Sequence, residues 1–212
     1  MMLRRTVLMG AVALGAAAAS LQAATTDILK NDKVAVTEVT LKPGEQAPLA
    51  ADHASVVVYL AGDEAQLKLA DGTERDITIE RGETVNEAAQ SGVLIDSGKQ
   101  PLQLVRVEFL TPGGHVAWGM TGLPPNYQMI FEDQYSRTYN IRVAAHSWEP
   151  RHTHRDRVVV CLSGAQLEHV LPDGKVVPST LKTDEVTWRA GQTHVGHNLG
   201  DTDLWVVAIE PK

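Results

Sequence analysis

The segment from residue 152 to residue 164 reads HTHRDRVVVCLSG, with two histidines, a charged stretch, an apolar run and a closing glycine. The apolar run at 158–162 is short and rich in β-branched residues, which is typical of a buried strand. A run of nearly the same composition lies 102 residues earlier, at 56–60, and it also ends before a glycine. The two runs indicate that the chain contains the same β unit twice.

The similarity extends well beyond these runs. Residues 48–108 align with residues 150–210 without a gap and with 18 identical pairs. A repeat of this length predicts a duplicated small domain and not a solenoid unit. Short apolar runs alternate with turn signals such as Asp71-Gly72 and Asp173-Gly174, and helical periodicity is absent. The pattern predicts an all-β protein built as sandwiches or barrels, with domains at 25–115 and 126–212 and a linker at 116–125.

The first 24 residues have the composition of a cleaved secretory signal peptide: a basic start, a short Ala/Gly-rich core and a small-residue end. We therefore expect an exported protein, periplasmic or secreted. Because Arg4-Arg5 also resembles a twin-arginine signal, both the Sec and the twin-arginine route stay open. Cleavage takes the net charge from −7 to −9, which argues against nucleic acid or a membrane surface as partner. A lone Cys161 excludes an intrachain disulfide.

Three histidines of the second unit have the spacing of metal ligands. His152 and His154 are two residues apart, so on a strand both side chains point to the same face. His194 follows a predicted turn and can be brought to them by a neighbouring strand. Three imidazoles on one ion leave coordination positions open, as catalytic metals require. We expect His146, His115 and His169 to lie on the surface or in loops, and His197 to point away from the site.

These motifs resemble those of the cupin superfamily. Its first motif, with His-x-His and a closing glycine, corresponds to residues 152–164, and its second motif corresponds to RAGQTHVGHN at residues 189–198. The resemblance covers nearly the whole chain after the leader, because the repeat extends it to the first unit. It implies a bicupin of two double-stranded β-helix barrels. It also implies one divalent transition metal, either Fe, Mn, Ni or Zn, held by the second barrel.

The chain departs from the family pattern at the position where a Glu ligand is expected, which is occupied by Arg157. Counting along an unbroken strand from His152 turns Asp156 inward, which makes it a candidate fourth ligand. Counting back from Gly164 turns Arg157 inward instead, where it would bind an anionic substrate. A β-bulge would reconcile the two counts. Both alternatives stay open at the level of the sequence, with a preference for Arg157.

The first unit lacks the histidines. At the offset of 102 residues, the positions of His152, His154 and His194 are occupied by Ala50, Asp52 and Gly92. We therefore expect a degenerate barrel without metal that packs against the second one.

Two classes of function follow, both with a small and anionic molecule as partner. One is a metal-dependent enzyme, such as a dioxygenase-like cupin. The other is a non-catalytic protein that binds a sugar, an effector or another small molecule. A purely structural metal is a third alternative. The chain could act as a monomer with paired barrels or as a homodimer.

Overall fold

The computed structural model describes residues 22–111 and 124–212, and these residues form eighteen β-strands and no helix. The first nine strands are Ala24–Lys30 (β1), Val34–Leu41 (β2), Gln46–Pro48 (β3), Ser55–Ala61 (β4), Glu64–Leu69 (β5), Glu74–Thr78 (β6), Thr84–Glu87 (β7), Gly92–Asp96 (β8) and Leu102–Phe109 (β9). The other nine are Tyr127–Glu132 (β10), Ser136–Val143 (β11), His152–His154 (β12), Arg157–Ser163 (β13), Ala165–Val170 (β14), Val176–Leu181 (β15), Val186–Arg189 (β16), Gln192–Asn198 (β17) and Leu204–Pro211 (β18).

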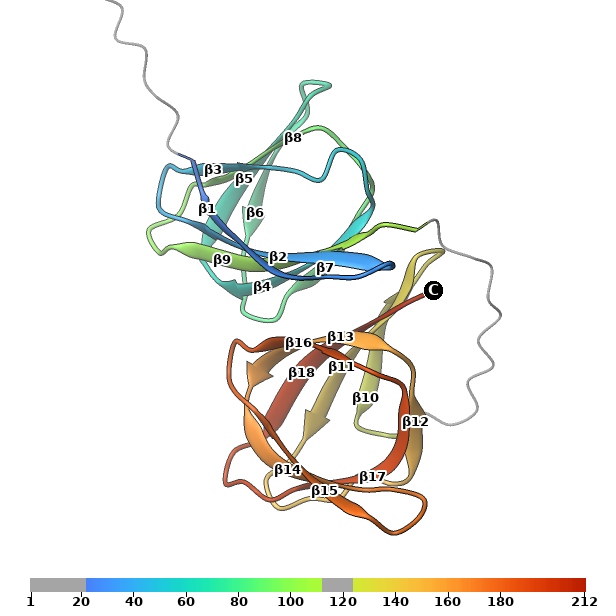
Figure 1. The fold of residues 1–212 in the computed structure, drawn as a ribbon. Helices are drawn as coiled ribbons and strands as arrows, with labels where there is room; N and C mark the ends of the chain where they lie inside the picture. Colours follow the sequence, from blue (N-terminus) through green and yellow to red (C-terminus); the bar gives the residue numbers. More distant parts are fainter. Residues whose placement is uncertain (1–21, 112–123) are drawn as a thin grey trace, which may run out of the picture.

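Each set of nine strands forms a barrel from two antiparallel sheets. In the first barrel the sheets have the orders β1-β2-β9-β4-β7 and β3-β8-β5-β6. In the second barrel the orders are β10-β11-β18-β13-β16 and β12-β17-β14-β15, which is the same arrangement strand for strand. Figure 1 shows the two barrels one above the other, with their five-stranded sheets facing. The fold class expected from the sequence, two all-β barrels in tandem, is confirmed.

A shared hydrophobic core joins the barrels. It is formed by the outward-facing side chains of the two five-stranded sheets, including Val56, Val58 and Leu60 of β4 and Val158 and Val160 of β13, all of them buried. The side chains between them, Val57 and Tyr59 of β4 and Val159 and Cys161 of β13, point into the barrels. Both strands are therefore buried on both faces. This double burial explains why these strands read as uninterrupted apolar runs, whereas a half-buried strand alternates.

Polar contacts reinforce the seam between the barrels. The guanidinium group of Arg81, in the first barrel, donates hydrogen bonds to the carbonyl oxygens of Leu60 and of Leu162, the latter at 2.7 Å. It also forms an ion pair with Asp184 of the second barrel. Leu60 and Leu162 are equivalent positions of the two barrels, so one side chain binds both sheets at matching points.

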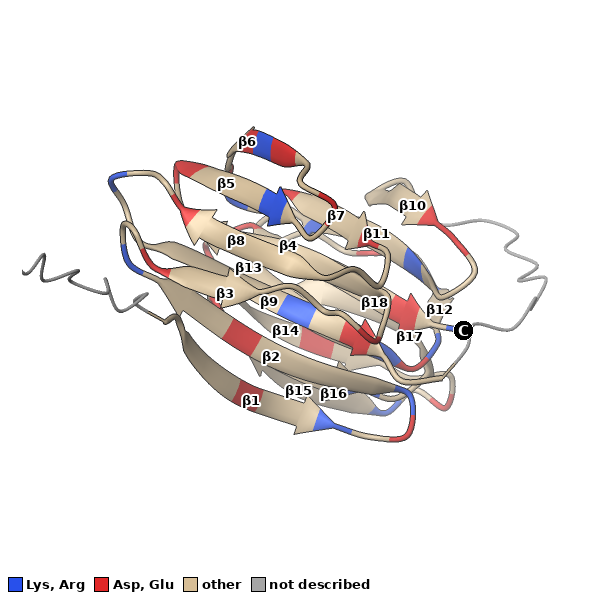
Figure 2. Cartoon of the chain, turned by 90° about the horizontal axis from the view of Figure 1, so that it is seen from above, with Lys and Arg blue, Asp and Glu red and all other residues tan. Residues whose placement is uncertain are grey.

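The ends of the predicted domains fall partly outside the described residues. The signal peptide was expected at residues 1–24, of which the structure describes the last three: Gln22 pairs with Gln46, and Ala24 is the first residue of β1. Most of the predicted linker, and His115, lie outside the described part of the chain. Within that part, no helix has the length and hydropathy to cross a membrane. Figure 2 shows Lys and Arg interspersed with Asp and Glu over both barrels.

Candidate metal centre

The pairing of β12 with β17 brings the three predicted histidines together. His152 lies directly opposite His194 across the two strands, and His154 is two residues further along β12 on the same face. Thr153, between them, points outward and its hydroxyl lies 2.8 Å from that of Thr193. All three histidines are buried on the inward face of the four-stranded sheet.

The ring nitrogens of these histidines converge. Nε2 of His152 lies 2.9 Å from Nε2 of His154, and the candidate ligand atoms of all three residues lie within 4.8 Å of one another. Nδ1 of His152 donates a hydrogen bond of 2.8 Å to the carbonyl oxygen of Pro150. That bond fixes the tautomer of His152 and leaves the Nε2 lone pair directed at the other imidazoles, a common arrangement for metal-binding histidines.

Burial keeps the imidazoles of His154 and His194 in the neutral form. It lowers the pKa of His154 far below its ordinary value, and the positive charge of Arg157 adds to the effect. Burial also lowers the pKa of His194 to about 3, with smaller contributions from neighbouring histidines and Arg157. Neutral imidazole is the form that binds a metal ion.

The residues fit a divalent transition metal. Nδ1 of His194 is buried and has no hydrogen-bond partner among the described residues. Buried polar atoms normally have such a partner, so this nitrogen is available to bind an ion. Three imidazoles with convergent nitrogens form a donor set that suits Zn, Fe, Ni or Cu. In the described part of the chain, this is the one group of three or more His, Cys, Asp or Glu residues close enough to hold an ion.

The structure distinguishes between Asp156 and Arg157, the two residues that the sequence offered as inward-facing. Residues 155–156 interrupt the strands, so His154 of β12 and Arg157 of β13 both point inward although they are three residues apart. Asp156 is half-exposed outside the cluster, where it accepts a hydrogen bond from the Gly191 amide at 2.8 Å. The placement of Asp156 therefore does not support its role as a fourth ligand, which an unbroken strand would require.

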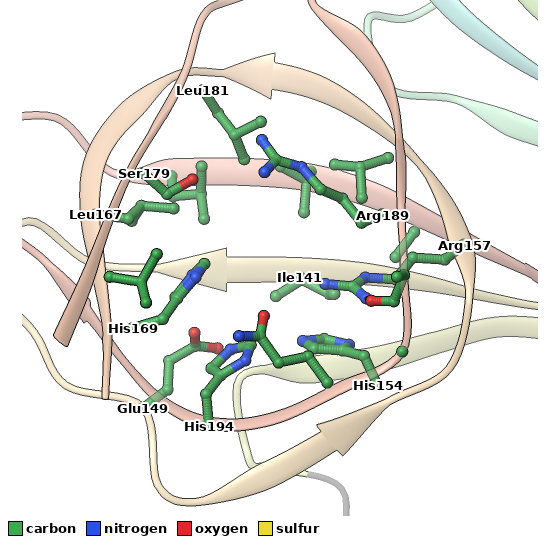
Figure 3. A pocket seen from close by; sticks show the side chains of 18 of the residues that line it. Ile141, Glu149, His154, Arg157, Leu167, His169, Ser179, Leu181, Arg189 and His194 are labelled. Atoms are coloured by element: carbon green, nitrogen blue, oxygen red, sulfur yellow. The ribbon is translucent and has the colours of Figure 1, made fainter. Parts of the chain in front are cut away.

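A cavity of about 470 Å³ opens beside the histidines inside the second barrel. Figure 3 shows its lining, in which Arg157 and Arg189 lie above His154 and His194, and Leu167 and Leu181 form an apolar wall. Arg157 is buried and donates hydrogen bonds to the carbonyl oxygens of Arg155 at 3.2 Å and of Ala190 at 3.4 Å. Burial lowers the pKa of its guanidinium to about 10.

Three lining residues, His169, Arg189 and Tyr127, were missed or misplaced by sequence reasoning. His169 was expected at the surface, and this was wrong: it lines the cavity, and its ring stacks on that of His194 with centroids 4.3 Å apart. Arg189, Tyr127 and Glu149 also line the cavity. Only the pairing of distant strands places them there. The one signal in the sequence was the position of Arg189 beside the second histidine motif.

The remaining histidines that the structure describes lie outside the cavity lining. His197 points to the other face of β17, where it stacks on Trp148 and pairs with Glu168 at 2.9 Å. His146 is exposed and lies 3.0 Å from the carboxylate of Asp201.

The interior of the first barrel contains an apolar cluster in place of the histidines. This cluster includes Leu49, Tyr59, Leu94 and Leu104. Arg106 of β9 reaches inward and donates a 3.0 Å hydrogen bond to the carbonyl oxygen of Pro48.

Comparisons with known proteins identify the fold. No protein-family model and no curated protein sequence matches the chain. Among solved structures, a cupin 2 conserved barrel domain protein from Leptotrichia buccalis matches with a TM-score of 0.60 and 12% identity, over 92% of this chain and 91% of its own.

Two further solved structures match over nearly the whole chain. Oxalate decarboxylase from Lactobacillus farciminis, in a formate complex, has a TM-score of 0.63 and 12% identity, over 91% of this chain and 82% of its own. AerE from Microcystis aeruginosa has a TM-score of 0.61 and 12% identity, over 90% of this chain and 98% of its own. The chain therefore has the cupin fold, with two barrels in tandem.

Proposed function

We propose that the second barrel binds one divalent transition-metal ion through His152, His154 and His194, and binds a small carboxylate beside it. The observation that carries this proposal is the cavity, in which neutral, convergent imidazoles lie next to two arginines. A metal ion bound there would act as a Lewis acid that binds and polarises an oxygen of the ligand. The arginines would hold the anionic group and orient it.

The arginine pair supports an anionic ligand. Arg157 and Arg189 are Cα partners in the β13–β16 ladder, so their side chains lie on the same face and both reach the cavity. Like charges directly opposite each other destabilise a sheet unless something compensates them. Glu149 is the one acidic residue among those that line the cavity. A bound carboxylate would supply the missing negative charge through charge-assisted hydrogen bonds.

Glu149 favours an enzyme over a simple carrier. Its carboxylate lines the same cavity and is mostly buried, and Oε1 accepts a hydrogen bond of 2.8 Å from Nδ2 of Asn126. A carboxylate held in this way can take up or release a proton beside a bound ligand. The oxalate decarboxylase that shares the fold was solved with formate. Oxalate and formate are therefore the first small carboxylates to test.

The test combines metal analysis with titration of the full chain. We expect about one ion per chain in the wild-type protein. The double variant His152→Ala with His154→Ala should lose it, while His146→Ala, which removes an exposed histidine, should retain it. Oxalate should bind in calorimetric titrations only when metal is present. Oxygen uptake and carbon dioxide release, measured on the same samples, then report turnover. The same two measurements on Glu149→Gln show whether turnover requires this carboxylate.

The outcomes separate the alternatives. Metal that survives loss of both histidines would overturn the site. Metal and carboxylate binding without turnover of any carboxylate tested would make the protein a binder. Unfolding on metal removal, without any ligand binding, would make the metal structural.

A further inference from the structure

The hydroxyl of Tyr127 lies beside two of the three clustered histidines, His152 and His154. Its oxygen is 3.0 Å from Nε2 of His152 and 3.0 Å from Nε2 of His154, and these two nitrogens are 2.9 Å apart. The three atoms therefore form a nearly equilateral triangle. Tyr127 is the first residue of β10, 25 residues before His152, and its ring also makes an edge contact with the imidazole of His152.

Hydrogen bonds alone do not account for this triangle. Nδ1 of His152 carries the proton that it donates to Pro150, and in this tautomer Nε2 has a single lone pair and no proton. One lone pair cannot be directed at two atoms that lie about 60° apart, because hydrogen bonds prefer near-linear geometry. Two donors at most, the Tyr127 hydroxyl and Nε2–H of His154, would have to satisfy three contacts.

The distances fit a different arrangement. Two ligand atoms that each lie about 2.1 Å from one ion, at about 90° to each other, are separated by about 3.0 Å. All three sides of the triangle have this length. The Nε2 lone pair of His152 can then be directed at an ion that lies at equal distance from all three atoms.

We infer that the hydroxyl oxygen of Tyr127 is a fourth protein ligand of the metal ion. This inference rests on the proposed metal site at His152, His154 and His194, and adds an oxygen donor from a different sheet. Phenol oxygen is an established metal donor in proteins. Tyr127 also lines the cavity that lies beside the histidines.

The test compares Tyr127→Phe with the wild-type protein and with Tyr139→Phe. Tyr139 is the matched control, because it is a buried tyrosine whose ring contacts that of Tyr127, with centroids 6.2 Å apart, and it does not belong to the residues that line the cavity. Zn(II) affinity is measured by competition with a chelator of known affinity. We expect Tyr127→Phe to weaken it about ten- to a hundred-fold, and Tyr139→Phe to leave it within about two-fold.

A spectroscopic readout separates a ligand from a residue that only orients the histidines. Fe(III) bound to a tyrosine oxygen gives a visible charge-transfer band. We expect this band in the Fe(III)-loaded wild type and in Tyr139→Phe, and its absence from Tyr127→Phe. Thermal unfolding of the metal-free variants checks that all three proteins are folded.

The results distinguish failure of this inference from failure of the metal site. If Zn(II) binding depends on the histidines but Tyr127→Phe binds as tightly as the wild type, the inference is overturned and the site stands. Weaker binding by Tyr127→Phe without a charge-transfer band in the wild type also overturns it, because Tyr127 would then only position the imidazoles. A wild-type protein that binds no metal overturns both.

Discussion

Arg157 and Arg189 face each other across the β13–β16 ladder, with both side chains turned into the cavity of the second barrel. The hydrogen bonds from Arg157 go to the carbonyl oxygens of Arg155 and Ala190 and not to a carboxylate. Glu210 and Glu149 interact with its charge only electrostatically, without a hydrogen bond to the guanidinium. One buried and one partly buried guanidinium group beside three imidazoles make a site that favours an anion. This relationship gives the most direct prediction about the ligand.

Replacement of either arginine should weaken carboxylate binding without loss of the metal. A charge-assisted contact to a buried carboxylate contributes about 1.5–3 kcal/mol, so Arg157→Ala and Arg189→Ala should each lower oxalate affinity about ten- to a hundred-fold. Calorimetric titration of the metal-loaded variants measures the affinity, and elemental analysis measures the metal.

The control for this prediction is Lys175→Ala, which removes one positive charge from an exposed hairpin turn of the same barrel. It should leave oxalate affinity unchanged. Equal losses in all three variants would show that only the overall charge of the protein matters. Loss of metal in Arg157→Ala would instead assign this residue to the metal site.

Removal of the metal should leave both barrels folded. The three hydrophobic clusters are formed by apolar side chains of the strands, and the histidines contribute to none of them. Cores of this size fold without a metal. After chelation we expect an unchanged β-sheet circular dichroism spectrum and a cooperative thermal transition at a lower midpoint. A featureless transition after chelation would contradict this expectation.

The fold was predictable from the sequence because its decisive strands are buried on both faces. The runs at 56–60 and 158–162 alternate between the shared core and the barrel interiors, so every position in them is apolar. Turn glycines separated the short strands. The spacing of His152 and His154 was sufficient to place both on one face, because this relationship is local to a single strand.

The rest of the site depends on pairing between strands that are distant in sequence. His169 reaches the cluster only because β14 pairs with β17, and Tyr127 only because β10 lies beside β11. Asp156 and Arg157 could not be assigned, since residues 155–156 interrupt the strands and change which side chain points inward. Side-chain patterns do not encode such an interruption.

The shared core should make the two barrels depend on each other for stability. Leu60 is 2% exposed and belongs to the cluster that both barrels form. Leu60→Ala leaves a cavity there and should lower the free energy of unfolding by about 2–5 kcal/mol. Equilibrium denaturation measures the change. Val176→Ala, at a position that is 51% exposed, is the matched control and should change it by less than about 0.5 kcal/mol. Comparable effects at the two positions would contradict a tight interface.

Two glycines of the first barrel test how closely its β6–β7 turn packs against the second barrel. Gly72 and Gly82 have nearly the same backbone conformation, with φ of +87° and +84°. A Cβ atom at Gly72 would meet nothing within 4 Å, whereas one at Gly82 would overlap the ring of Trp205 and lie 2.9 Å from Leu162. Trp205 and Leu162 both belong to the second barrel.

Alanine at the two glycines should therefore separate backbone strain from interdomain packing. Gly72→Ala carries only the cost of a left-handed backbone for a residue with a Cβ, about 1–2 kcal/mol. Gly82→Ala carries the same cost and must also displace Trp205, which adds about 1–3 kcal/mol for an overpacked contact. Chemical denaturation of both variants gives the difference, and fluorescence of the tryptophans reports displacement of Trp205. If the two variants lose the same stability and the fluorescence is unchanged, the turn moves away from the second barrel freely, and the contact at Gly82 does not contribute to the interface.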